Sequence, residues 1–62
     1  MTDLKGTLLK ETTNAYYIDY DGDKQWIPRS LVPYIRKEPE KDGVREIDFI
    51  LETWKAKQLG WD

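Results

Sequence analysis

The chain contains no cysteine and no histidine. Disulfides and the usual thiolate or imidazole zinc sites are therefore excluded as sources of stability, although small domains often depend on them. With 62 residues, the chain also lies near the lower size limit for independent folding. We therefore expect a single domain, residues 1–62, that is stabilised by apolar packing and holds no metal and no cofactor.

Long hydrophobic runs are missing as well. No stretch approaches the 18 apolar residues of a membrane helix, and residues 1–10 lack the basic and then apolar order of a signal peptide. Charged residues make up 35% of the chain while the net charge is only -2, which is typical of a well-solvated surface. The sequence therefore predicts a cytoplasmic protein with no membrane partner.

Groups that perform catalysis are scarce. Ser30 is the only serine, and no imidazole is present to activate it. Asp19, Asp21 and Asp23 alternate as in a calcium-binding loop, but Lys24 and Ser30 stand where an EF-hand needs glycine and glutamate. We therefore expect a solvated turn at these acids, and a chain that is not an enzyme.

Turn residues divide the first half of the chain into three short strands, which we predict at residues 5–11, 15–20 and 24–27. The Asp21-Gly22 step supplies the tight turn between the second and the third. A two-residue loop pairs Tyr17 with Trp26, whereas a three-residue loop pairs Ile18 with Trp26. The two registers bury opposite faces of the strand, and the sequence leaves the choice open.

A corner follows the third predicted strand. Pro28 has no amide hydrogen to continue a central strand, so residues 28–32 are expected to form a short helical turn. Pro33 then begins an extended segment, and the charged residues 38–43 form the next loop.

The last third of the chain fits either a helix or a strand. Ile47, Phe49 and Leu51 alternate with acidic residues, and this alternation favours a strand at 45–52. We expect Thr53 to be the N-cap of a short helix at 54–59 and Gly60 to end it.

Together these elements predict a mostly β fold, namely a small five-stranded, partly open barrel with a short C-terminal helix. Its expected core comprises twelve side chains: Leu8, Tyr16, Ile18, Ile27, Leu31, Val32, Ile35, Ile47, Phe49, Leu51, Trp54 and Leu59.

Two resemblances extend this interpretation. The segment QWIPRSLV, residues 25–32, resembles the short helical turn before the final strand of Src-homology-3 domains, which implies a barrel of the Src-homology-3-like type. The chain is also similar to small uncharacterised proteins of bacteriophages and mobile elements, which share a W-[IL]-P-x-S strand end and a later W-x-A-x-x-x-G segment. These motifs lie here at 26–30 and 54–60. This second resemblance implies a phage or mobile-element protein in a bacterial host cell, but it implies no particular chemical activity.

The charge distribution nominates a binding surface. Residues 24–37 contain four basic residues and no acidic residue, so this segment has a charge of +4. The net charge of the whole chain is -2, and the remaining residues therefore sum to -6. Basic residues interleaved with aromatic ones suit a protein partner or single-stranded nucleic acid. We favour a non-catalytic module that binds a bacterial protein, because the isoelectric point lies near 5.0 and nucleic-acid domains are usually basic. The candidate contact residues are Lys24, Trp26, Arg29, Tyr34, Arg36 and Lys37.

Two of the three tryptophans carry separate expectations. Trp61 follows Gly60 close to the end of the chain, so we expect it to be exposed or to pack on a second copy as a homodimer contact. Trp26 suits the core as well as the surface, and the sequence does not decide between them.

Overall fold

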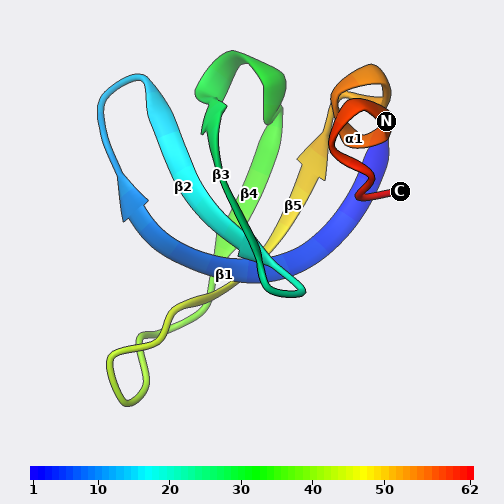
Figure 1. Ribbon diagram of the computed structural model, residues 1–62. Coiled ribbons are helices and arrows are strands. Elements are labelled where there is room, and N and C mark those ends of the chain that lie inside the picture. Colours follow the sequence, from blue (N-terminus) through cyan, green and yellow to red (C-terminus); the bar gives the residue numbers. More distant parts are fainter.

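The computed structural model describes all 62 residues. Five antiparallel strands form one curved sheet in the order β3-β2-β1-β5-β4, which is not closed, so that β3 and β4 are its two edges (Figure 1). The predicted mostly β, partly open fold with a short C-terminal helix is therefore confirmed. The elements are β1 (Thr2–Glu11), β2 (Ala15–Tyr20), β3 (Asp23–Pro28), the 3-10 turn η1 (Arg29–Leu31), β4 (Tyr34–Lys37), β5 (Glu46–Leu51) and α1 (Thr53–Leu59).

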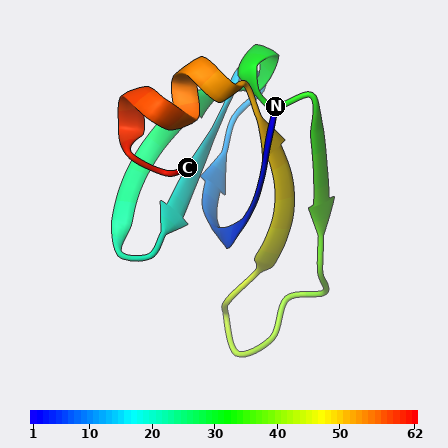
Figure 2. The ribbon, with the colours of Figure 1, turned by 90° about the vertical axis from the view of Figure 1, so that its right-hand side faces the viewer.

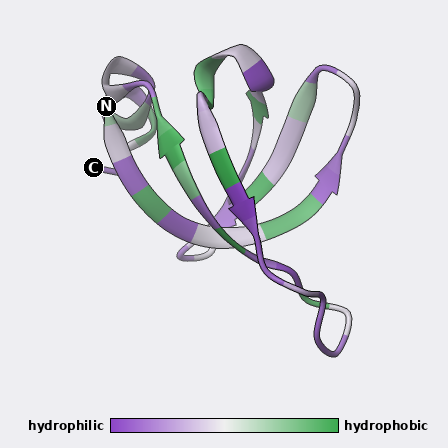
Figure 3. Ribbon diagram, turned by 180° about the vertical axis from the view of Figure 1, so that it is seen from behind, coloured by the Kyte–Doolittle hydropathy of each residue, from purple (hydrophilic) through white to green (hydrophobic).

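The sheet and helix α1 enclose the core between them. Figure 2 shows α1 lying across the concave side of the sheet, and Figure 3 shows hydrophobic and hydrophilic segments alternating along the arc of β1. Alternation sends every second side chain of a strand to the concave side. The buried residues are Leu4, Leu8, Tyr16, Ile18, Ile27, Val32, Ile47, Phe49, Leu51, Ala56 and Trp61.

The β2–β3 hairpin has the two-residue turn. Asp21 and Gly22 both adopt positive φ angles, 52° and 89°, which glycine tolerates best and aspartate tolerates better than most residues. Tyr17 therefore pairs with Trp26, and Ile18 with Gln25. This register puts Ile18 in the core and Trp26 on the convex side of the sheet.

The corner at Pro28 forms as predicted, but its place in the strand order differs from the one that the Src-homology-3 resemblance implies. The turn η1 leads into β4, the fourth of five strands, and not into the final strand. After β4, residues 38–45 project from the body of the protein (Figure 1). Asp42 and Gly43 form a second turn with positive φ angles at the tip of this loop.

The C-terminal third contains the predicted strand followed by the predicted helix. The N-cap of α1 is Glu52, so the expected N-cap Thr53 is instead the first helical residue. Its hydroxyl accepts a 3.4 Å hydrogen bond from the Thr2 hydroxyl, at the start of β1. Gly60 ends the helix in the left-handed conformation, with φ 76°, as predicted.

The expectation that Trp61 is exposed or packs on a second copy is wrong. Its side chain is only 2% exposed, and its ring lies 5.1 Å from that of Tyr20 and 6.4 Å from that of Phe49, between centroids. The reason is the left-handed turn at Gly60, which folds the chain back so that the Trp61 amide donates to the Ala56 carbonyl over 2.8 Å. Trp61 therefore belongs to the core of its own chain and provides no dimer contact.

Trp54 was expected in the core, and this prediction is also wrong, because 57% of the residue is exposed. A helix of seven residues presents one narrow face to the sheet, and in α1 the fully buried residue on that face is Ala56. Three further residues of the expected core pack only partly buried against it, namely Leu31, Ile35 and Leu59. The prediction missed Leu4, Ala56 and Trp61.

Candidate functional site

The convex side of the β2–β3 hairpin carries an exposed pair of aromatic rings. Trp26 is 48% exposed, although it stands in the middle of a strand. Its ring stacks on that of Tyr17 in β2, with 4.8 Å between the centroids and 21° between the planes. Because offset stacking adds to the attraction of simple contact, the Tyr17 ring holds the Trp26 indole in place.

Two lysines flank these rings. Lys10 of β1 is the cross-strand neighbour of Tyr17, and Lys24 lies two residues before Trp26 on the same side of β3. Lys24 in turn pairs across the hairpin with Asp19. We call the set Lys10, Tyr17, Lys24 and Trp26 the aromatic face.

Tyr34 and Arg36 lie on the convex side too, but on β4, at the opposite edge of the sheet. Four strand steps of about 4.8 Å separate β3 from β4, so about 19 Å of curved sheet lies between the two edges. Arg36 forms ion pairs with Glu38 at 2.6 Å and with Asp48 at 3.5 Å. The hydrogen bond and charge of Glu38, and then the charge of Asp48, raise the pKa of Arg36 above its ordinary value. Its charge is therefore locally balanced.

Arg29 lies on neither of these surfaces. Its guanidinium donates to the Glu11 carboxylate at 2.8 Å, to the Tyr16 hydroxyl at 2.9 Å and to the Thr12 carbonyl at 2.9 Å. It also lies over the Tyr16 ring, 4.4 Å from the centroid. Arg29 therefore fastens η1 to the β1–β2 hairpin.

Lys37 binds the same carboxylate. Its Nζ donates to the two Glu11 oxygens at 2.7 and 2.9 Å. The hydrogen bond from Lys37 is the main reason why the pKa of Glu11 lies below its ordinary value. Burial opposes this shift, while the charge of Lys37 and the hydrogen bond and charge of Arg29 add to it. Glu11, Tyr16, Arg29 and Lys37 thus form one ion cluster, which ties the ends of β1 and β4 to η1.

A β-bulge in β1 makes this cluster possible. Leu8 pairs with Ile18 and Lys10 with Tyr17, so Leu9 is an extra residue in the β1 strand. The extra residue reverses the alternation after it, and Glu11 therefore falls opposite Tyr16 instead of on the other side of the sheet. Without the bulge, the Glu11 carboxylate would point away from Arg29.

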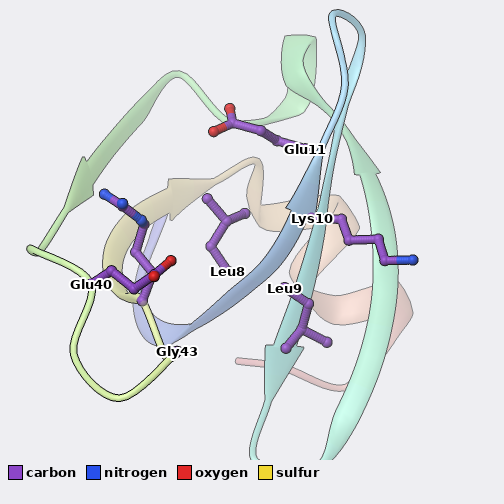
Figure 4. A pocket seen from close by; sticks show the side chains of 7 residues that line it. Leu8, Leu9, Lys10, Glu11, Glu40 and Gly43 are labelled. Atoms are coloured by element: carbon purple, nitrogen blue, oxygen red, sulfur yellow. The ribbon is translucent and has the colours of Figure 1, made fainter.

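A shallow hollow of about 170 Å³ lies beside the bulge (Figure 4). Its walls come from the end of β1 and from the projecting loop, and they carry charges of both signs. Usual ligand pockets begin at roughly 300 Å³, so the hollow does not favour a small-molecule site. The lining residues are Leu8, Leu9, Lys10, Glu11, Glu40, Gly43 and Arg45.

Two of the three alternating acids of the β2–β3 turn, Asp19 and Asp23, bind groups of the protein itself. Asp19 Oδ1 accepts the Gly22 amide at 2.9 Å, which closes the turn. The Asp23 carboxylate accepts a hydrogen bond from the side-chain amide of Gln25 at 3.0 Å and one from the Trp61 indole N–H at 2.8 Å. Nowhere in the chain do three His, Cys, Asp or Glu side chains gather in a metal-binding arrangement.

The six predicted contact residues therefore separate into three places. Lys24 and Trp26 lie on the aromatic face, Arg29 and Lys37 in the ion cluster, and Tyr34 and Arg36 at the β4 edge. Tyr17 and Lys10, which lie beside Lys24 and Trp26, were not among the predicted contact residues. The two-residue turn register pointed to Tyr17, whereas the bulge that places Lys10 beside it left no signal in the sequence.

Comparisons with protein-family models, with curated proteins and with solved structures find no match to this chain. No helix in the structure has the length and apolar character needed to cross a membrane.

Proposed function

We propose that this chain is a non-catalytic protein-binding module and that its docking surface is the aromatic face. The observation that carries the proposal is the exposed Trp26 indole, held against Tyr17 and flanked by two lysines. Tryptophan and tyrosine are the residue types that contribute most to protein interfaces, and fixing a ring beforehand reduces the entropy lost on binding.

The proposed partner is a bacterial protein that presents an apolar side chain to Trp26 and a carboxylate to Lys10 or Lys24. Opposite charges on the two surfaces speed the encounter and suppress wrong partners. The cytoplasm of a bacterial host and a phage or mobile-element origin are part of this proposal, and they rest on the motif resemblance at residues 26–30 and 54–60 alone.

We no longer propose Arg29 and Lys37 as contact residues. Both already share the Glu11 carboxylate, so recruiting either for a partner would break hydrogen bonds of 2.7 to 2.9 Å within the protein. Tyr34 and Arg36 are not proposed as contact residues either, because they lie at the other edge of the sheet.

Single-stranded nucleic acid is the second candidate. The face of the Trp26 indole opposite Tyr17 is free to stack on one base, beside the Lys24 ammonium. Two features favour a protein instead: the Tyr17 ring is already engaged in stacking, and Asp19 stands beside Lys24. The two candidates differ in salt dependence, since phosphate contacts make nucleic-acid binding strongest at low salt.

A pull-down from bacterial lysate tests the proposal. The variants are Trp26→Ala and, as a matched control, Trp54→Ala, which removes an equally large and more exposed indole from α1. We expect Trp26→Ala to lose the partner and Trp54→Ala to keep it. Equal recovery with both variants would reject the aromatic face. Quenching of tryptophan fluorescence by a short single-stranded oligonucleotide at low salt, absent in Trp26→Ala, would favour the second candidate.

A further inference from the structure

The β3 strand has a neighbour on one side only, namely β2. The two-residue turn makes Tyr20 and Asp23 the first hydrogen-bonded pair, and such pairs then alternate along the hairpin. Gln25 and Ile27 consequently bond to β2. The backbone groups of Lys24 and Trp26 point to the open edge, and no hydrogen bond outside the strands uses them.

The other edge of the sheet is guarded. In β4, Lys37 lies two residues after Ile35 and so points to the same inner side, where Glu11 accepts its hydrogen bonds. An inward-pointing charge on an edge strand is a common natural device against edge-to-edge pairing. On β3 the inward-facing charge, Asp23, lies outside residues 24–26, and the inward-facing residue within that stretch is the uncharged Gln25.

We infer that two copies of this chain pair through their β3 edges, antiparallel, with Lys24 of one copy opposite Trp26 of the other. The pairing rests on a symmetry in residues 24–26, because Lys24 and Trp26 flank Gln25 at equal distance and on the same side of the strand. A two-fold axis at Gln25 therefore brings each Lys24 to the Trp26 of the second copy, and it does so twice.

In this register the free backbone groups at the β3 edge of one copy form hydrogen bonds with the same groups of the second copy. Each copy offers two N–H donors and two carbonyl acceptors, at Lys24 and Trp26, so the pair forms four backbone hydrogen bonds. On the convex side, each ammonium approaches the indole opposite it, a favourable cation–aromatic contact. Because the second copy supplies both the backbone hydrogen bonds and the cation–aromatic contacts, we assign it as the occupant of this edge.

The assembly stops at two copies. Pro28 lies at the next position whose N–H would face the open edge, and it has no N–H to offer. The guarded β4 edge accepts no third copy, so the contact is of the closed, isologous kind. In this dimer the two aromatic faces lie side by side on one continuous sheet.

The mass in solution tests this inference directly. We expect sedimentation and light scattering, between micromolar and near-millimolar concentration, to show a mass that rises from 7.4 kDa toward twice that value. Hydrogen exchange monitored by NMR is the second measurement. The Lys24 and Trp26 amides, which have no partner within one chain, should become protected in parallel with dimer formation.

Two variants of Lys24 distinguish the contribution of its backbone hydrogen bond to the dimer from that of its side chain. Lys24→Ala removes the ammonium and keeps the N–H, whereas Lys24→Pro removes both and presents a ring to the second copy. We expect the fold to tolerate the change, because Pro28 occupies a position of β3 whose N–H would likewise face the open edge. We expect the dissociation constant of Lys24→Pro to exceed that of Lys24→Ala by about tenfold or more, because two interface hydrogen bonds are lost.

A 7.4 kDa mass at near-millimolar concentration, with both amides exchanging at the rate of a free peptide, would overturn the inference. So would a dimer that Lys24→Pro leaves intact. Should this variant fail to fold, as circular dichroism would reveal, the exchange of the wild-type amides decides alone. Neither measurement involves a partner protein, so its outcome is independent of the pull-down that tests the proposed function.

Discussion

The indole N–H of Trp61 donates a 2.8 Å hydrogen bond to the carboxylate of Asp23, 38 residues earlier in the chain. The bond joins the end of the chain to the first residue of β3, while the Trp61 ring fills the space beside Tyr20 and Phe49. This hydrogen bond, and then that of Gln25, lowers the pKa of Asp23. The C-terminal residues thus close one end of the core.

Truncating Trp61 should strongly destabilise the fold. We expect Trp61→Ala to lower the free energy of unfolding by about 3 to 5 kcal/mol, the usual cost of removing a buried large aromatic side chain. Trp61→Phe, which keeps a ring but loses the N–H donor, should cost much less. Urea denaturation followed by circular dichroism measures both, and a Trp61→Ala protein as stable as the wild type would contradict the burial of this ring.

The ion cluster predicts a specific dependence of stability on acid. The pKa of Glu11 is held below its ordinary value near 4.5 in the folded protein, so this carboxylate stabilises the fold fully above that pH. The contribution is lost as the pH falls from about 4.5 through the lower folded-state pKa. We therefore expect the stability advantage of the wild type over Glu11→Gln to be constant near pH 6 and to shrink below pH 4.5. A pH-independent difference would show that Glu11 gains nothing from Lys37 and Arg29. Asp23 titrates in both proteins, so its effect cancels in the comparison.

Gly6 should not tolerate a side chain. A Cβ atom at this position of β1 would lie 2.8 Å from the Asp19 carbonyl oxygen, and that oxygen belongs to the backbone of β2. We expect Gly6→Ala to destabilise the fold by about 1 to 3 kcal/mol, as overpacking does elsewhere. Lys5→Ala on the exposed side is the matched control, with a change within about 0.5 kcal/mol. Equal denaturation midpoints for the two variants would contradict this close approach.

The three tryptophans should differ in their access to solvent. Variants with a single tryptophan, each made by changing the other two indoles to phenylalanine, allow quenching by acrylamide to be measured ring by ring. Trp54 and Trp26 should be quenched readily, since 57% and 48% of these residues are exposed. Trp61, at 2%, should be shielded. Efficient quenching of Trp61 would mean that the C-terminal turn does not hold it in the core.

Much of the local structure could be predicted because it depends on residues close together in the chain. Asp21-Gly22 favours a tight turn, Pro28 ends a strand, and Gly60 ends a helix, each through its own backbone preferences. The alternation of Ile47 and Phe49 with acidic residues identified the strand β5 for the same reason. The candidate surface did not follow from such rules, because residues 24–37 are contiguous in sequence but run from one edge of the sheet to the other.

The sequence by itself determined the kind of protein this is: one small β domain without disulfides, turned at Asp21-Gly22 and Pro28 and ended at Gly60. Only the tertiary structure decided which tryptophan is buried, which charges are free and which aromatic residues share a surface. The physical reason is that pairing between distant strands sets these outcomes. One extra residue at Leu9 turns Glu11 toward Arg29 and Lys37, and the strand order sends Trp26 and Tyr34 to opposite edges.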